Sequence, residues 1–107
     1  MNYNIHIISD AEEDIFSIYK YVAINDSVEK AEHLIKNIED SIYRLVSLPN
    51  RGHFPPELER IGILEYKEIH FKPYRIIYSI EDTDVFIHCV LDGRRDLSDL
   101  LQERLLR

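Results

Sequence analysis

The sequence predicts a single α+β domain in which helices pack on one antiparallel sheet. In the first half of the chain, apolar residues recur at three- and four-residue steps, which is the period of amphipathic helices. From Ile63 onward they recur at every second residue, which is the period of strands, before a last helical stretch. The chain has 107 residues, 45% of them hydrophobic, so it can fill one core but not two. We therefore expect one domain over residues 1–107.

The N-terminal segment is expected to be a strand followed by a helix. Asn2 to Ile8 alternates apolar and polar residues, as a half-buried strand does. Ser9 or Asp10 can then cap a helix, with Glu12 or Glu13 placed to complete a capping box, and acidic groups suit the positive N-terminus of a helix. The buried stripe of this helix follows at helical spacing: Ile15, Ile18, Tyr19 and Val22.

A second, longer helix is expected after Asn25-Asp26-Ser27, which interrupts the first pattern and supplies a cap. The two helices should form an antiparallel hairpin. Pro49 ends it, because the residue before a proline is pushed out of helical geometry, and Asn50 to Pro56 reads as a surface loop. The apolar positions of the second helix are Ala31, Leu34, Ile35, Ile38, Ile42, Leu45 and Val46.

Three strands are expected next, at Ile63 to His70, Tyr74 to Ile80 and Val85 to Leu91. Their short connections, Lys72-Pro73 and Glu81 to Asp84, predict an antiparallel meander. The second and third strands are apolar on both faces, as central strands are. Alternation places Tyr74, Ile76, Tyr78 and Ile80 opposite Ile77, and Val85, Ile87, Cys89 and Leu91 opposite Phe86 and Val90.

A C-terminal helix completes the predicted order, with Asp96 as its cap. Asp99 near its start and Arg104 near its end complement the helix dipole. This helix should pack on the same sheet as the hairpin. Its apolar stripe is Leu97, Leu100, Leu101 and Leu105.

Charge and composition exclude several functional classes. The formal net charge is −7, whereas proteins that bind nucleic acid through its phosphates normally present a basic surface, so we expect no sequence-specific DNA binding by this chain alone. No segment reads as a membrane span or a secretion signal, and the single cysteine, Cys89, falls in an apolar run, where a buried thiol is expected. These features predict a cytoplasmic protein. A local basic patch could still form among Lys67, Lys72, Arg75, Arg94 and Arg95.

The chain resembles the RelE/ParE toxins of bacterial type II toxin–antitoxin (plasmid stabilisation) systems. The resemblance lies in Tyr74-Arg75-Ile76-Ile77-Tyr78 and Asp92-Gly93-Arg94-Arg95-Asp96, and in the order of the segments from Ser9 to Leu97. It implies the RelE/ParE fold: an N-terminal strand, a helical hairpin, a three-strand meander and a terminal helix. It also implies a cognate antitoxin that lays a helix and an extended segment over the toxin. The family has two mechanistic groups, one cutting messenger RNA on the ribosome and one blocking DNA gyrase.

The nuclease group would imply basic side chains that grip RNA phosphates. Arg75 matches the arginine of the Tyr-Arg-Ile-Ile-Tyr strand, Arg95 an arginine just after the last strand, and Lys67 or His70 could complete such a site. The alternative for Arg75 is a cross-strand ion pair with Glu65 or Glu68. Both interpretations remain open from the sequence.

Two differences from the RNA-cutting members of the family favour the gyrase group. Many RNA-cutting members carry a terminal Tyr or His that can stack on a base or move a proton, whereas no Tyr, His or Phe follows His88 here. The acidic balance also disfavours docking on ribosomal RNA. We therefore expect a ParE-like toxin that inhibits DNA gyrase by binding, without catalysis. Ribosome-dependent mRNA cleavage is the alternative, and a decayed toxin that only binds its antitoxin is a third.

Contacts with the target or the antitoxin are expected at a loop aromatic, two arginines and the last helix: Phe54, Arg94, Arg95, Leu100 and Leu101. We expect no cofactor, because no phosphate-binding or hydrolase motif occurs. We also expect no metal. The histidines His6, His33, His53, His70 and His88 are not at the short spacings of zinc motifs.

Overall fold

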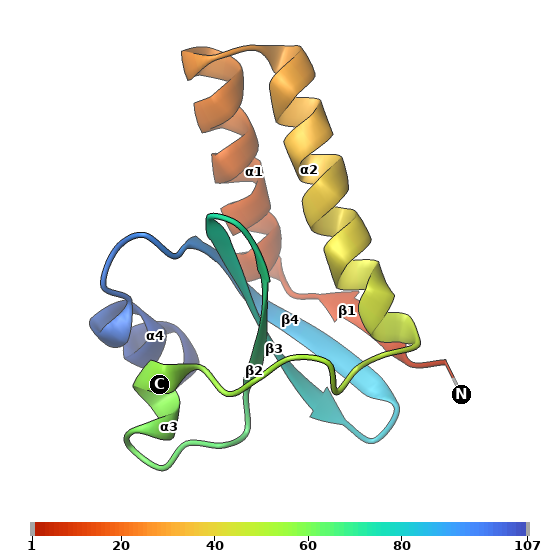
Figure 1. The fold of residues 1–107 in the computed structure, drawn as a ribbon, viewed down its shortest axis with the longest axis vertical. Helices are drawn as coiled ribbons and strands as arrows, with labels where there is room; N and C mark the ends of the chain where they lie inside the picture. Colours follow the sequence, from red (N-terminus) through yellow and green to blue (C-terminus); the bar gives the residue numbers. More distant parts are fainter. Residues whose placement is uncertain (1, 107) are drawn as a thin grey trace.

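A computed structural model describes residues 2–106 and contains the predicted succession of elements (Figure 1). Its helices and strands are β1 (Asn4–Ile7), α1 (Ser9–Asn25), α2 (Val28–Tyr43), the 3-10 turn η1 (Arg44–Val46), α3 (Pro56–Glu59), β2 (Lys67–Phe71), β3 (Tyr74–Glu81), β4 (Asp84–Asp92) and α4 (Ser98–Leu105). The predicted α+β class, with hairpin, meander and terminal helix, is confirmed.

The sheet has four strands in the order β1-β4-β3-β2. β2, β3 and β4 form the predicted antiparallel meander, and β1 adds to the far side of β4 in parallel. The strands β3 and β4 are therefore central, as their two apolar faces predicted. Because β2 lies at an edge, one side of its backbone is open to other segments of the chain.

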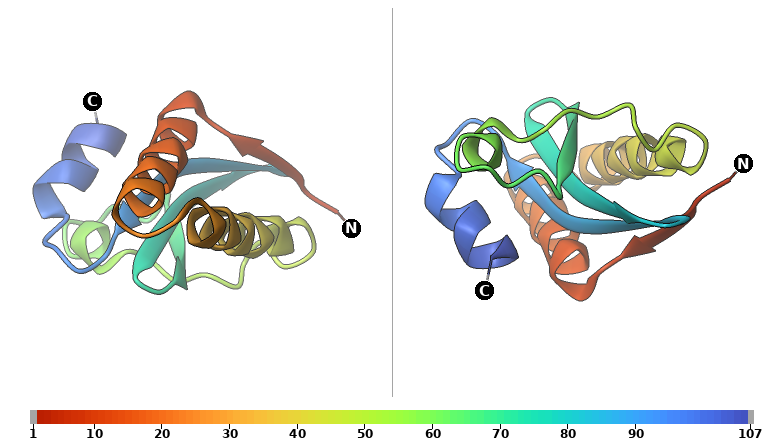
Figure 2. Two further views of the ribbon diagram at one scale, coloured as in Figure 1. Left: turned by 90° about the horizontal axis from the view of Figure 1, so that it is seen from above. Right: turned by 90° about the horizontal axis from the view of Figure 1, so that it is seen from below.

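Helices cover both faces of this sheet (Figure 2). The α1–α2 hairpin packs on one face, around a first core that includes Ile38, Ile42, Tyr78 and Ile87. On the other face α3 and α4 enclose a smaller second core, made of Leu58, Ile77, Cys89, Leu91, Leu97 and Leu101. The terminal helix is thus on the opposite side of the sheet from the hairpin.

A β-bulge at His88 changes which side chains of β4 share a face of the sheet, compared with the prediction. Ile77 pairs with Cys89 and Tyr78 pairs with Ile87, so His88 has no partner of its own on β3. One extra residue reverses the alternation. Val90 consequently packs in the first core, while Cys89 and Leu91 pack in the second, so the prediction that Val85, Ile87, Cys89 and Leu91 share a face was wrong.

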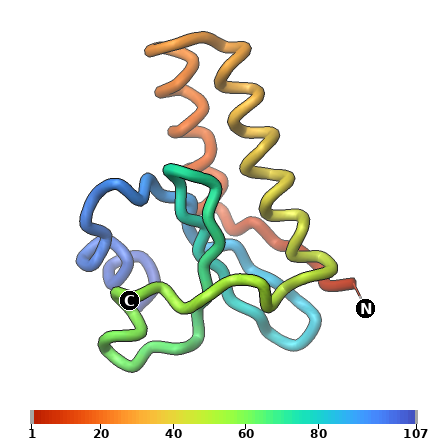
Figure 3. Tube along the Cα trace, viewed as in Figure 1, coloured from red at the N-terminus to blue at the C-terminus, as the bar shows by residue number. Residues whose placement is uncertain are grey.

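The segment between α2 and β2 differs most from the prediction. It runs across the sheet from the end of α2 to α3 (Figure 3), and α3 forms where the sequence indicated a loop. Strand β2 begins at Lys67, not Ile63. Within this segment His53 and Glu68 form an isolated antiparallel bridge, so the loop borders the open side of β2.

The helix caps were predicted unevenly. Ser27 Oγ accepts a hydrogen bond from the Lys30 N–H, which confirms the cap of α2. Helix α1 instead begins after Ile8 with no side-chain cap, so the capping box predicted there was wrong. Asp96 Oδ1 accepts a hydrogen bond from the Ser98 N–H at the start of α4. The N-cap position of α4 is Leu97, so Asp96 acts one residue earlier than predicted. None of the helices within residues 2–106 has the length and apolarity to cross a bilayer.

Candidate functional site

A cluster of charged side chains lies where β2 and β3 meet α3 and the loop before it. We call it the Arg75 cluster; it comprises His53, Glu57, Glu68, His70 and Arg75. The register of the strands explains part of it, because His70 pairs with Arg75 and Glu68 pairs with Ile77 across β2 and β3. These positions share one face of the sheet. Ile77 belongs to the second core, so the cluster lies on the α3 and α4 side.

Arg75 is held by two carboxylates. Its Nη1 and Nη2 donate to Glu57 Oε2 and Oε1 at 2.6 and 2.7 Å, and its Nε donates to Glu68 Oε1 at 2.6 Å. The side chain of Arg75 is only 11% exposed and that of Glu68 only 2%. The alternative read from the sequence, a cross-strand pair of Arg75 with Glu68, is thus present, with Glu57 of α3 added to it.

Electrostatics reinforce the charged form of this cluster. The hydrogen bonds from Arg75 hold the pKa of Glu57 below its usual value, against the opposing effect of burial. The carboxylates of Glu57 and Glu68 raise the pKa of Arg75. Because the guanidinium is hydrogen-bonded to both carboxylates, it is a structural cation more than a free one.

Two glycines make room for the cluster. A Cβ on Gly93 would lie 2.8 Å from Cγ and Cδ of Arg75, so the aliphatic part of the arginine crosses directly over this glycine. A Cβ on Gly52 would lie 2.6 Å from both the Glu68 carbonyl oxygen and the Tyr78 hydroxyl. That hydroxyl donates to the Pro49 carbonyl at 2.7 Å and accepts from the Gly52 N–H at 3.2 Å. Tyr78 thereby anchors the loop that carries His53.

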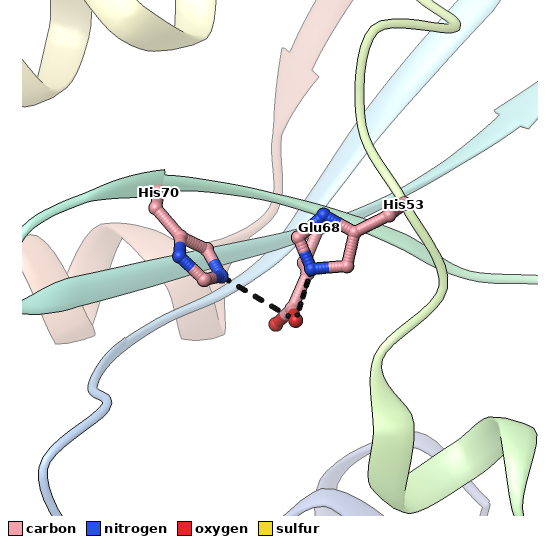
Figure 4. Close-up of side chains that lie close together, drawn as sticks. All are labelled: His53, Glu68 and His70. Carbon is pink, nitrogen blue, oxygen red and sulfur yellow. Dashed lines mark hydrogen bonds and ion pairs between the residues drawn. The ribbon is translucent and has the colours of Figure 1, made fainter.

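The two histidines converge on the remaining oxygen of Glu68. Figure 4 shows the imidazoles of His53 and His70 directed at its carboxylate, where their Nε2 atoms lie 2.9 and 3.4 Å from Oε2. The sequence did not predict that His53 and His70 both lie against Glu68. The only local signal is that Glu68 and His70 alternate on one strand, while His53 arrives through the bridge to β2.

The other predicted nuclease residues, Lys67 and Arg95, line cavities that Arg75 does not line. Lys67 Nζ is 4.7 Å from the ring centroid of Phe54, which is half-buried. Arg95 is exposed and lines a cavity of about 360 Å³ between α1 and the end of β4. Arg94 is exposed, donates to Asp92 at 2.7 Å, and also lines a separate cavity of about 300 Å³ with Arg75. Lys67, Arg75 and Arg95 therefore line three different cavities.

The predicted contact residues of the last helix are largely covered. Leu101 is fully buried in the second core, and Leu100 is half-buried against it. Arg104 of α4 donates to both oxygens of Asp14 at 3.1 and 2.9 Å and to the His88 carbonyl. Helix α4 is therefore tied to α1 and β4 by its polar side as well as by its leucines.

A further cavity, of about 570 Å³, lies beside the start of β2, the end of β3 and His88 of β4. Lys67, Tyr66 and His88 are among its lining residues. The His88 Nε2 lies 2.8 Å from the Ser79 hydroxyl, and the Tyr66 ring meets the imidazole edge-on, with centroids 5.3 Å apart. Burial lowers the pKa of His88, so the ring is neutral at physiological pH. A phenol ring and a neutral imidazole thus meet here, and Lys67 lines the same cavity.

Comparison with solved structures shows the same fold. The structure is similar to one described as the chromosomal ParDE toxin–antitoxin system of P. aeruginosa, with a TM-score of 0.71, 15% identity and coverage of 84% of this chain and 95% of the other. It is similar to a double arginine-to-alanine mutant of the E. coli toxin RelE in the free state, with a TM-score of 0.66, 15% identity and coverage of 100% and 98%. For the RelBE2 toxin–antitoxin complex of Mycobacterium tuberculosis the TM-score is 0.63, the identity 15%, and the coverage 86% and 92%.

Sequence comparison narrows the relationship. The chain is 29% identical to Toxin ParE3 of Caulobacter vibrioides over 91 residues, which span 85% of this chain and 87% of that protein. The family model described as the ParE toxin of the type II toxin–antitoxin system parDE matches residues 5–97, nearly the whole domain. The chain therefore belongs to the ParE family of type II toxin–antitoxin toxins.

Proposed function

We propose that this toxin acts by binding DNA gyrase, without cleaving RNA, and that a cognate antitoxin neutralises it in the bacterial cytoplasm. Membership of the ParE family supports this reading, and so does the state of Arg75. Inhibition by binding would fit a role in plasmid stabilisation, where a toxin must be held in check by its partner.

The observation that carries the proposal is the commitment of Arg75 to Glu57 and Glu68. A nuclease arginine stabilises the negative charge that develops on a phosphate in the transition state, and each well-placed donor contributes roughly 3 kcal/mol. Here Nε, Nη1 and Nη2 already donate to carboxylates, and the side chain is 11% exposed. Bringing this guanidinium to RNA would leave two carboxylates without their partner, which is costly.

Partner contacts are proposed at the exposed cations near the end of β4. Arg94 and Arg95 are both exposed, and arginine is enriched at the energetic centres of interfaces. Phe54, with Lys67 over its ring, is a second contact candidate. Leu100 and Leu101 would act by holding α4 in place, since they pack in the second core.

The antitoxin is proposed from the relatives, two of which are described as toxin–antitoxin assemblies. Charge indicates the chemistry of its contact. Residues 1–50 carry nine acidic against four basic side chains, so the hairpin face would attract a basic antitoxin segment. A groove of about 270 Å³ on this face, lined by Ile15, Phe16, Tyr19 and Ile35, could receive apolar side chains of such a segment.

One observation favours RNA cleavage as a second candidate. The cavity of about 570 Å³ brings together Lys67, Tyr66 and His88, and a neutral imidazole beside a phenol is chemically able to move a proton. In this reading the catalytic groups differ from those that the sequence suggested. Arg75 would then have a structural role only, through Glu57 and Glu68.

The test is to induce the chain alone in bacteria and to follow labelled thymidine and labelled methionine during the first minutes. Early loss of thymidine incorporation with continuing translation supports gyrase inhibition; early loss of methionine incorporation contradicts it. Purified toxin should also block supercoiling by gyrase. In both assays Arg95→Glu should weaken the effect while Lys36→Glu, on the exposed side of α2, should not. A nuclease would instead be inactivated by His88→Gln.

A further inference from the structure

We infer that His53, Glu68 and His70 form a binding site for a divalent transition-metal ion of the zinc class. The Nε2 atoms of the two histidines lie 2.9 and 3.4 Å from Glu68 Oε2. One donor atom from each of the three residues lies within 4.8 Å of the others. This site is independent of the proposed function, since neither gyrase binding nor RNA cleavage requires it.

The donor set has the right chemistry for such an ion. Two imidazole nitrogens and one carboxylate oxygen are ligands that Zn²⁺ accepts at about 2.0–2.2 Å, leaving a fourth position for water or a partner group. At those bond lengths, tetrahedral ligand atoms lie about 3.4 Å apart. The separation of His70 Nε2 from Glu68 Oε2, 3.4 Å, matches this value, and that of His53 Nε2, 2.9 Å, would have to lengthen slightly. The imidazoles are 59% and 43% exposed, so small rotations can bring them to the ion.

The backbone holds the three residues in register. Glu68 and His70 are two residues apart on β2, so their side chains leave the same face of the strand. The His53 N–H donates to the Glu68 carbonyl at 3.1 Å, and the Glu68 N–H donates to the His53 carbonyl at 2.7 Å. This reciprocal pair fixes His53 beside Glu68 even though it belongs to a loop. The site is therefore assembled before any ion arrives.

Arg75 and Glu57, the two other members of the Arg75 cluster, support the metal ligands from outside. Arg75 Nε donates to Glu68 Oε1, which keeps that oxygen occupied and leaves Oε2 directed at the histidines. Glu57 holds Arg75 in turn. Hydrogen bonds of this kind orient metal-ligating carboxylates and favour their charged form. The Glu68 side chain is only 2% exposed, so its carboxylate is contacted by Arg75 and the two histidines and is largely shielded from water.

A bound ion would tie the loop that carries His53 to the edge strand β2. It would replace a hydrogen bond and an ion pair of Glu68 by coordination bonds, and so would hold the loop more firmly. The experiment is a calorimetric titration of the chain, without a polyhistidine tag, with Zn²⁺ at about pH 7.5, where imidazole is mainly neutral. We expect one saturable site per chain, and visible absorption of four-coordinate Co²⁺ when cobalt replaces zinc.

Matched variants decide whether the site is the one described. His53→Ala and His70→Ala should each weaken Zn²⁺ binding at least about tenfold, the smallest loss usual even for outer-shell partners. The control is His6→Ala, because His6 Nε2 forms a pair of equal length, 2.9 Å, with Asp84 on the opposite edge of the sheet. It should bind as the unaltered chain does, and so should His33→Ala on the exposed side of α2.

The outcomes are distinct. Loss of binding in both cluster variants, with circular dichroism unchanged, supports the site. The proposal is overturned if the unaltered chain shows no saturable binding, if the double variant His53→Ala/His70→Ala binds as tightly, or if only His6→Ala loses binding. Because calorimetry does not involve gyrase or RNA, failure here leaves the proposed function untouched, and failure of the growth experiments leaves the metal site untouched.

Discussion

Arg75 donates hydrogen bonds to Glu57 from both terminal nitrogens, Nη1 to Oε2 at 2.6 Å and Nη2 to Oε1 at 2.7 Å. Such two-point pairing is the strong geometry for an arginine and a carboxylate. It joins β3 to α3, a helix of four residues that is too short to be stable without tertiary contacts. With Leu58 buried beside it, the pair fixes α3 over the second core.

Replacing Arg75 by methionine should therefore destabilise the domain. The change keeps much of the aliphatic packing but leaves Glu57 and Glu68 without their cation, and breaking a buried pair in this way costs about 3–5 kcal/mol. Urea denaturation followed by circular dichroism measures the change in the free energy of unfolding. Lys72→Met, at an exposed position in the turn before β3, is the control and should stay within about 0.5 kcal/mol. Equal stability of the two variants would show that Arg75 is held more loosely than these contacts indicate.

Helix α4 should depend on Arg104 in a similar way. This guanidinium donates to both oxygens of Asp14 and to the His88 carbonyl, and its side chain is 16% exposed. Arg104→Met should lower the free energy of unfolding by roughly 1.5–3 kcal/mol, the range for hydrogen bonds to charged groups. Hydrogen exchange should rise most in Ser98–Leu105. Glu103→Gln, exposed on the same helix, should leave both measurements unchanged; faster exchange spread evenly over the domain would argue against a local anchor.

The periodicity of the sequence predicted the hairpin, the meander and the central position of β3 and β4, because these elements express an apolar face along a continuous run. It failed at His88. A bulge adds one residue without any change in composition, so strict alternation carried Cys89 and Leu91 to the wrong side of the sheet. The helix α3 was also missed, since four residues contain a single turn and show no period.

The candidate site was predictable only where neighbouring strands define it. The pairing of Arg75 with Glu68 follows from the meander, and it was one of the two alternatives for Arg75. Glu57 and His53 come from the segment between α2 and β2, whose path depends on contacts such as the Tyr78 hydroxyl with Pro49 and Gly52. Nothing local in the sequence encodes that path. The histidine pair facing Glu68 was therefore invisible in the spacing of the histidines along the chain.

Cys89 should be inert in the folded protein. The thiol is fully buried in the second core, and burial raises its pKa to about 12, so almost no thiolate is present at neutral pH. Native protein should react with an aromatic disulfide reagent only as fast as it unfolds, whereas protein in denaturant should react at once. Arg75→Met, which loosens the same side of the sheet, should react faster than the unaltered chain. Rapid labelling of the native protein would mean that the second core opens readily.

His88 should make stability fall in mild acid. Burial lowers its pKa in the folded protein from the ordinary value of 6.5, nearby Arg104 lowers it further, and Glu81 acts in the opposite direction. Below that ordinary value the unfolded chain binds a proton that the folded protein does not. Lowering the pH therefore favours the unfolded state and reduces the free energy of unfolding. The contribution of His88 is thus fully present above the unfolded pKa and is lost as the pH falls through the folded one.

The measurement is urea denaturation at about pH 7.5 and about pH 5.5, on either side of the ordinary histidine pKa. The unaltered chain should be less stable at the lower pH, and His88→Gln should reduce this difference because glutamine does not titrate. His33→Gln, at an exposed position of α2, should leave it unchanged. Because His88→Gln differs from the unaltered chain at this one position, the comparison between the two isolates His88. An identical loss of stability in His88→Gln would assign the acid sensitivity to another group.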